Sequence, residues 1–151
     1  MRTVFFPGSF NPFTKGHADI VDRMTTLCDK VVIGVGINSL KAESDGNIQK
    51  NVEKIKEIYS GTEYAGKVEV ISYTGLTMEK AREIGAQCVV RGVRSAVDFD
   101  YEYTLAAANR KAFGIETILL PADPSLSYVS SSLVRDLQKY GSEHLASEFL
   151  P

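Results

Sequence analysis

The sequence contains no tryptophan, only two cysteines and no long hydrophobic run. Cys28 and Cys88 are far apart and have no C-x-x-C spacing, so we expect two packed thiols rather than a disulfide or a metal pair. No apolar stretch approaches the roughly 18 residues of a membrane-spanning helix. The apolar run after Met1 ends at Pro7, which is too early for a secretory signal. These absences predict a soluble, cytoplasmic protein without a membrane partner.

The sequence also has no large excess of charge of either sign: it contains 17 Lys and Arg and 19 Asp and Glu, which gives a formal net charge of -2. No global basic field therefore suggests general binding of nucleic acid. The 151 residues are enough for one domain with a sizeable core and too few for two. The chain has no linker, internal repeat or low-complexity tract, so we expect a single domain over residues 1–151.

Apolar runs rich in β-branched residues alternate with segments of helical periodicity along the chain. The pattern predicts strands at 3–7, 31–37, 67–73, 87–92 and 116–121, and helices at 17–30, 48–60, 76–85, 98–113, 131–140 and 142–150. Such alternation is typical of an α/β protein, here a single doubly wound five-stranded parallel sheet with right-handed crossovers. Ligands of such sheets bind beyond the carboxyl ends of the strands, near the point where the strand order reverses.

The loops after the first, second, fourth and fifth predicted strands are expected to approach one ligand site at the carboxyl ends of the strands. These loops are residues 7–17, 38–41, 91–94 and 126–132. In the first loop, Gly8 lets a phosphate approach the backbone, and Ser9 offers a hydroxyl. Gly16 allows a tight helix start, which places His17 at a helix N-terminus, where an anion is favoured. The alternative is a surface histidine beside an ordinary turn, but the combination of residues favours phosphate binding.

The other loops carry matching chemistry. Arg91 and Arg94 lie three residues apart after a buried run, and each is able to hold a phosphate with two hydrogen bonds. Glu102 and Asn109 share a face of the helix that follows. In the last loop, residues 130–132 are three serines at a helix start, which suits the β- and γ-phosphates of a nucleotide, although any one serine is explained as an N-cap.

Three motifs carry a resemblance to a known family. Residues 8–12 and 16–17 resemble the signature G-[ST]-F-[DN]-P-x-x-x-G-H of the nucleotidyltransferases related to class I aminoacyl-tRNA synthetases. Val129 to Ser132 with Arg135 resembles the [IV]-S-S-[ST]-x-x-[RK] motif of that superfamily. The run R-G-V-R-x-x-x-D-F-D-Y-E over residues 91–102 narrows the resemblance to the phosphopantetheine adenylyltransferase family. Asn11 stands where many members have Asp, which argues against a catalytic carboxylate there, and residues 42–50 depart from the family pattern.

The resemblance implies the roles of individual residues. Four residues are expected to be catalytic: Ser9, His17, Lys41 and Arg91. The residues expected to bind ATP are Ser9, Phe10, His17, Gly92, Val93, Arg94, Glu102, Leu126, Ser127, Tyr128, Val129, Ser130, Ser131 and Ser132. Those expected to bind 4'-phosphopantetheine are Ser9, Lys41, Thr77, Arg91 and Asn109. The sequence has no dense cluster of carboxylates that would predict a metal site built by the protein. We therefore expect Mg²⁺ to arrive with ATP.

The implied reaction is direct in-line attack of the phosphate of 4'-phosphopantetheine on the α-phosphorus of ATP, giving dephospho-coenzyme A and pyrophosphate. By family we also expect a homohexamer and inhibition by coenzyme A. Two alternatives within the superfamily transfer a nucleotide to nicotinamide mononucleotide or to glycerol 3-phosphate, and the 91–102 run argues against them. A non-catalytic nucleotide-binding module is a third alternative, and it would not need both halves of a two-substrate site.

Overall fold

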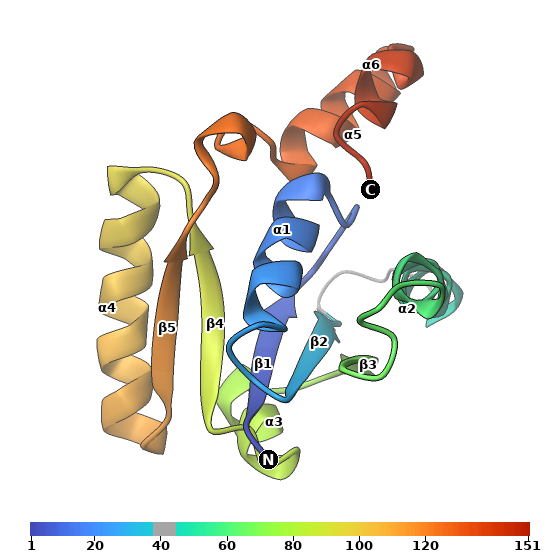
Figure 1. The fold of residues 1–151 in the computed structure, drawn as a ribbon. Coiled ribbons are helices and arrows are strands. Elements are labelled where there is room, and N and C mark those ends of the chain that lie inside the picture. Colours follow the sequence, from blue (N-terminus) through green and yellow to red (C-terminus); the bar gives the residue numbers. More distant parts are fainter. Residues whose placement is uncertain (38–44) are drawn as a thin grey trace.

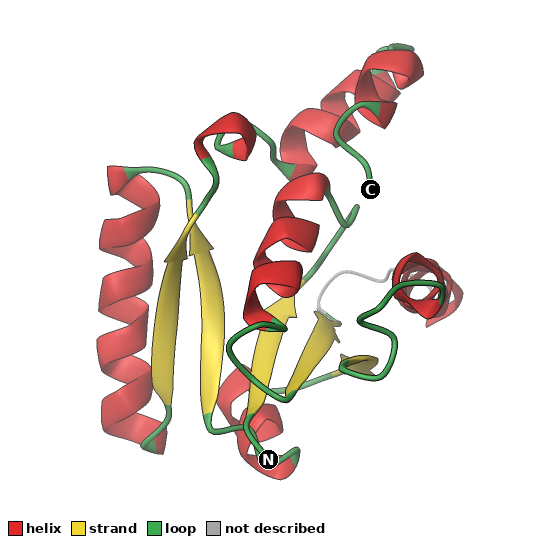
Figure 2. Ribbon diagram, viewed as in Figure 1, coloured by secondary structure: helices red, strands yellow, loops and turns green. Residues whose placement is uncertain are grey.

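The computed structural model describes residues 1–37 and 45–151 and contains one five-stranded sheet. All strand pairs are parallel, and the order is β3-β2-β1-β4-β5 (Figures 1 and 2). This confirms the predicted fold class. The elements are β1 Thr3–Gly8, α1 Lys15–Met24, β2 Lys30–Gly36, α2 Asp45–Ser60, β3 Val68–Tyr73, α3 Thr77–Glu83, β4 Cys88–Val93, α4 Ala96–Phe113, β5 Glu116–Pro121, a 3₁₀ turn Pro124–Leu126, α5 Ser131–Lys139 and α6 Glu143–Ser147.

The strand order reverses at the centre of the sheet. The chain runs outward from β1 to β2 and β3, then crosses back to place β4 on the other side of β1, and ends at β5. The carboxyl ends of β1 and β4 are therefore neighbours at the reversal, where ligands of such sheets bind. Helices α5 and α6 lie beyond the same edge of the sheet, above the arrowheads of β1, β4 and β5 in Figure 1.

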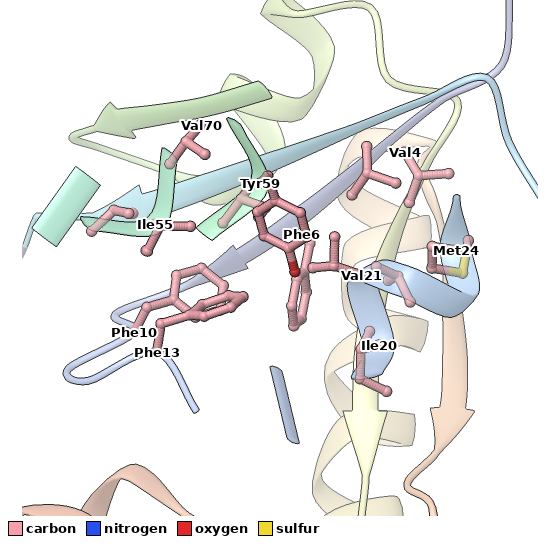
Figure 3. Close-up of a cluster of buried hydrophobic side chains, with 14 of the residues drawn as sticks. Val4, Phe6, Phe10, Phe13, Ile20, Val21, Met24, Ile55, Tyr59 and Val70 are labelled. Atoms are coloured by element: carbon pink, nitrogen blue, oxygen red, sulfur yellow. The ribbon is translucent and has the colours of Figure 1, made fainter. Parts of the chain in front are cut away.

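The two faces of the sheet carry different helices. On one face, side chains of β1 and β2 pack against α1 and α2, as Figure 3 shows for Phe6, Val21 and Ile55. On the other face, Phe5, Val32 and Val89 pack against α3. Because α3 lies in the crossover from β3 to β4, it must pass under the central strands, and this brings its first residues towards the end of β1.

The helix that carries His17 differs from its predicted bounds. It starts two residues earlier than expected because the hydroxyl of Thr14 accepts a hydrogen bond from the backbone N–H of His17 and so caps the helix. The helix ends at Met24 rather than at residue 30, and Leu27, which lies beyond it, is 60% exposed. Cys28 lies beyond the helix and donates from Sγ to the carbonyl of Met24. Cys28 is buried, Cys88 is half-buried, and both are free thiols, as predicted.

The second helix also starts earlier than expected, at Asp45 rather than at residue 48. Its apolar side chains Val52, Ile55 and Tyr59 are buried and belong to the core cluster that includes β1 and β2. At the other end of the chain, the carbonyl of Phe149 accepts a hydrogen bond of 2.8 Å from the backbone N–H of Lys15, so the C-terminal residues contact the start of α1. Within the described residues, no helix has the length and apolar character needed to cross a membrane.

Gly34 in β2 gives a test of the packing. A Cβ added there would lie 2.3 Å from Cε2 and 2.4 Å from Cζ of the fully buried Phe5. We expect Gly34→Ala to lower the free energy of unfolding by about 1–3 kcal/mol, the usual cost of overpacking a core. Urea unfolding at matched protein concentration measures this. Gly61→Ala is the control, because nothing lies within 4 Å of that position. Equal unfolding midpoints for Gly34→Ala and the wild type would contradict this account.

Candidate active site

The loop between β1 and α1 is held by side chains from three other elements. The carbonyl of Pro7 accepts from Nη1 of Arg91 in β4 at 2.9 Å, and the carbonyl of Phe10 accepts from Asn51 in α2 at 2.7 Å. From α5, Arg135 donates to the carbonyl of Asn11 at 2.6 Å and Ser131 donates to the carbonyl of Pro12 at 2.7 Å. The loop is therefore fixed by contacts between residues far apart in the sequence.

Packing also fixes the loop from inside. Phe10 has a φ of 46° and a side chain that is 2% exposed. A Cβ on Gly8 would come within 3.0–3.2 Å of the Phe10 ring, so the glycine is needed for packing as well as for the expected access of a phosphate. The ring of Phe10 belongs to the core and is not available to stack on a base. Among the described residues no side-chain hydrogen bond of Asn11 accompanies this turn.

A first cavity, of about 370 Å³, opens beside this loop at the ends of β1 and β4. It brings together most of the residues expected to bind ATP. These are Ser9, Phe10, His17, Gly92, Arg94, Glu102, Leu126, Val129, Ser130, Ser131 and Ser132, with Arg91 and Arg135. Val93, Ser127 and Tyr128 do not line it. Tyr128 is largely exposed and packs edge-on against Phe149 instead.

A second cavity, of about 460 Å³, adjoins the first and contains the other expected substrate residues, Thr77 and Asn109. Both cavities are lined by Ser9, Arg91 and Glu102. The loop after β3 was not among the four loops predicted to form the site. It lines this cavity because α3, which follows it, packs beneath the central strands. Sequence reasoning also missed Tyr73, whose hydroxyl lies 2.9 Å from Oγ1 of Thr77. Its position as the last residue of a strand was the signal that could have identified it.

His17 is the third residue of α1, not its first, because Thr14 caps the helix. The backbone N–H of Thr14 donates to Nδ1 of His17 at 3.0 Å, so cap and histidine bond each other reciprocally. Burial and the positive charges of Arg94 and Arg91 lower the pKa of His17 to about 4. The imidazole is therefore neutral at neutral pH. Gly16 lies inside the first turn, and a Cβ there would make only ordinary contacts with Thr14 and Val129, so a tight helix start does not require it.

Arg91 has an acidic partner that the sequence did not reveal. Its Nε and Nη2 donate to the carboxylate of Glu102 at 2.8–3.2 Å, and Glu102 is 6% exposed. Glu102 is thus a buried partner of Arg91 that also lines both cavities, and its expected contact with ATP stays a prediction. Nη1 also donates to the carbonyl of Pro7, so one N–H each of Nη1 and Nη2 is left for a ligand.

Arg94 is restrained in a similar way. Its Nε and its backbone N–H both donate to Oδ2 of Asp98, at 3.0 and 3.1 Å. Hydrogen bonds and charge from Arg94 keep the pKa of Asp98 below its usual value although burial opposes this. Each arginine is therefore oriented by a carboxylate and keeps part of its five N–H donors for a ligand, and bidentate binding of a phosphate stays a prediction.

The three serines divide their roles. Ser130 is the N-cap of α5, and its hydroxyl accepts from the backbone N–H of Leu133 at 3.1 Å. Ser131 is bonded to the loop, and the hydroxyl of Ser132 accepts from Nη2 of Arg135 at 3.2 Å. The simple capping explanation thus holds for Ser130, while the helix N-terminus still faces the first cavity. Lys41, also expected in the site, lies outside the described residues.

Solved structures share this fold. A bifunctional NMN adenylyltransferase/ADP ribose pyrophosphatase from Francisella tularensis matches with a TM-score of 0.61 at 15% identity, over 93% of this chain and 42% of that one. A putative nicotinate-nucleotide adenylyltransferase from Vibrio parahaemolyticus matches with a TM-score of 0.59 at 18% identity, over 93% and 83% of the two chains. At such identities these structures show the fold alone.

Curated relatives are much closer in sequence. The phosphopantetheine adenylyltransferase of Bacteroides fragilis is 46% identical over 100% of this chain and 97% of its own length. That of Porphyromonas gingivalis is 45% identical over 97% of this chain and 92% of its own. The cytidylyltransferase-like family model matches residues 5–137. The chain therefore belongs to the phosphopantetheine adenylyltransferase family, within the cytidylyltransferase-like proteins.

Proposed function

We propose that the protein transfers the adenylyl group of ATP to 4'-phosphopantetheine, forming dephospho-coenzyme A and pyrophosphate in coenzyme A synthesis. The observation that carries this proposal is the meeting of two cavities at Ser9, Arg91 and Glu102. The first cavity has a helix N-terminus and cationic side chains, which suit a triphosphate. The second has a larger share of apolar side chains, including Leu105 and Phe113, which suits an elongated arm such as pantetheine.

The reaction needs positioning and charge stabilisation rather than a base, because a phosphate monoester is already nucleophilic at neutral pH. One of its oxygens bonds to the α-phosphorus of ATP while the bond from that phosphorus to pyrophosphate breaks. In this proposal, Ser9 and His17 donate hydrogen bonds to the α-phosphate. Arg91, with Lys41, holds the incoming phosphate.

The remaining polar groups of the first cavity are assigned to the leaving pyrophosphate. The N-terminus of α5 at residues 130–132, together with Arg94, is placed to stabilise the negative charge that develops there. The described residues contain no group of three His, Cys, Asp or Glu side chains that would hold a metal ion. We therefore assign Mg²⁺ to the phosphates of ATP, where it supplies charge neutralisation when bound.

Pyrophosphate release tests the proposal directly. ATP-Mg²⁺ with 4'-phosphopantetheine is compared with ATP and nicotinamide mononucleotide, and with CTP and glycerol 3-phosphate. We expect turnover with the first pair only. Turnover with another pair would keep the fold but remove the pantetheine assignment of the second cavity. No turnover with any pair would replace the proposal by a nucleotide-binding module.

The exposed aromatic and apolar side chains of α4 are relevant to assembly. Val97 and Tyr101 on one side of this helix, and Phe99 and Tyr103 on another, are half or more exposed, and β5, which the helix covers, is an edge strand. A soluble monomer rarely leaves so many large apolar side chains together on one helix. With the family resemblance, this supports a homohexamer, which sedimentation velocity would show as one large species rather than a monomer. Inhibition by coenzyme A and a cytoplasmic location belong to the same proposal.

His17→Ala tests the assignment of the donor to the α-phosphate. A donor aimed at charge that develops in the transition state contributes about 10²–10³-fold to kcat, so we expect a loss of that order with little change in the KM for ATP. Steady-state kinetics with both substrates measures this. His144→Ala is the matched control, because His144 is an exposed histidine of α6. A weaker ATP affinity with unchanged kcat would contradict the assignment.

Asn109→Ala tests the division between the cavities. Asn109 lines the second cavity and not the first, so its truncation should raise the KM for 4'-phosphopantetheine severalfold and leave the KM for ATP unchanged. Lys111→Ala, an exposed position on the same helix, should alter neither. If Asn109→Ala changed only the KM for ATP, the roles of the two cavities would have to be exchanged.

A further inference from the structure

The environment of Nδ1 of His17 determines which form of the ring is present. The backbone N–H of Thr14 points at Nδ1 at 3.0 Å, and Oγ1 of Thr14 lies 3.2 Å from the same nitrogen. Thr14 itself is 1% exposed, so water does not compete for these contacts. A backbone N–H can only donate, which means that Nδ1 must be an acceptor without a proton. The ring proton is therefore on Nε2.

The Thr14 hydroxyl supports the same assignment. Its oxygen accepts from the backbone N–H of His17 in the helix cap, which leaves its hydrogen free to be donated to Nδ1. Protonation of Nδ1 would place an N–H against the N–H of Thr14, which would lose its acceptor. The contacts with Thr14 alone therefore disfavour the cation of His17, before the rest of the cavity is considered.

The charged groups around the ring act in the same direction. Arg91, Arg94 and Arg135 line the cavity that contains His17. The two carboxylates that line it, Asp98 and Glu102, are each bonded to an arginine. Within the described chain neither carboxylate bonds the imidazole, so nothing there favours its cation. Burial and the charges of Arg94 and Arg91 accordingly lower the pKa of His17 to about 4.

Aromatic packing holds the ring in place. The Phe10 ring meets the imidazole edge-on, with centroids 5.0 Å apart, and the Phe13 ring lies 5.5 Å away. Phe6 lies on another side at 6.3 Å. These contacts leave Nε2 as the ring nitrogen that is not taken up by Thr14.

We propose that Thr14 is a positioning residue that fixes His17 as the neutral Nε2–H tautomer, so that His17 donates a hydrogen bond to the ligand but neither carries charge nor transfers a proton. The part that concerns the ligand rests on the proposed function. In that reaction every proton stays in place, because the attacking oxygen of the phosphate bears none and pyrophosphate leaves with the electron pair of the broken bond. A fixed neutral donor is therefore sufficient.

The tautomer can be measured without any assay of activity. Long-range ¹H–¹⁵N spectra of the ¹⁵N-labelled chain distinguish protonated from unprotonated ring nitrogens. His144→Gln leaves His17 as the only imidazole and so assigns its signals, since the chain has two histidines. We expect a protonated Nε2 and an unprotonated Nδ1 at neutral pH, with no cation until the pH falls to about 4. A proton on Nδ1, or titration of His17 in the ordinary pH range of an imidazole, would overturn the proposal.

Variants of Thr14 test whether this residue is the cause. Thr14→Val keeps the shape but removes the hydroxyl, so the cation of His17 should form at a higher pH and the acidic limb of the kcat profile should move upward with it. Thr14→Ser keeps the hydroxyl and should restore both. A loss of stability alone would move neither. An unchanged titration and profile in Thr14→Val, or no rescue by serine, would refute the role of the Thr14 hydroxyl.

The two proposals fail in different ways. If pyrophosphate release is absent with every substrate pair while the spectra show the Nε2–H form, the reaction is wrong and the tautomer stands. If adenylyl transfer occurs and the spectra show a proton on Nδ1, the reaction stands and the role of Thr14 is wrong.

Discussion

The fixed backbone of the β1–α1 loop is the constraint on which the rest of the site depends. Three of its carbonyl groups accept hydrogen bonds from Asn51, Ser131 and Arg135, which come from α2 and α5, and the carbonyl of Pro7 in β1 accepts from Arg91 of β4. These bonds tie the loop to the neighbouring strand and to two helices. Because the loop leads directly into the helix that carries His17, each of these side chains helps to define where the imidazole lies. A site of this kind is preorganised by the fold before any ligand arrives.

Charge in the site follows the same principle. Arg91 and Arg94 are not loose cations, since Glu102 and Asp98 hold their guanidinium groups in fixed orientations. A buried pair such as Arg91 with Glu102 adds little net stability to a fold, because desolvation offsets most of the attraction. What it does provide is direction, since a long flexible side chain is kept at the junction of the two cavities. Positive charge is thereby present without the mobility that arginine usually has.

The fold and much of the site were predictable because their signals are local in the sequence. Alternating strand and helix patterns predicted the parallel sheet. The rule about strand ends selected four loops, of which the three that the structure describes line one cavity. Signals that depend on tertiary contacts were missed. The pairing of Arg91 with Glu102 joins residues on different elements, and nothing in the spacing distinguishes Glu102 from a solvated helix residue. The cap at Thr14 was missed because a histidine stands where a capping box has Glu or Gln.

The contact between Lys15 and Phe149 has a consequence for how the protein is made. The backbone N–H at the start of α1 finds its acceptor in one of the last residues of the described chain. During synthesis on the ribosome, the first helix therefore emerges long before its partner does. The helix that presents His17 can pack on the sheet early, but its first turn is closed only when the C-terminal residues have left the exit tunnel. A nascent chain that stops short of Phe149 therefore has the strands and helices of the core while the backbone N–H of Lys15 still lacks this acceptor.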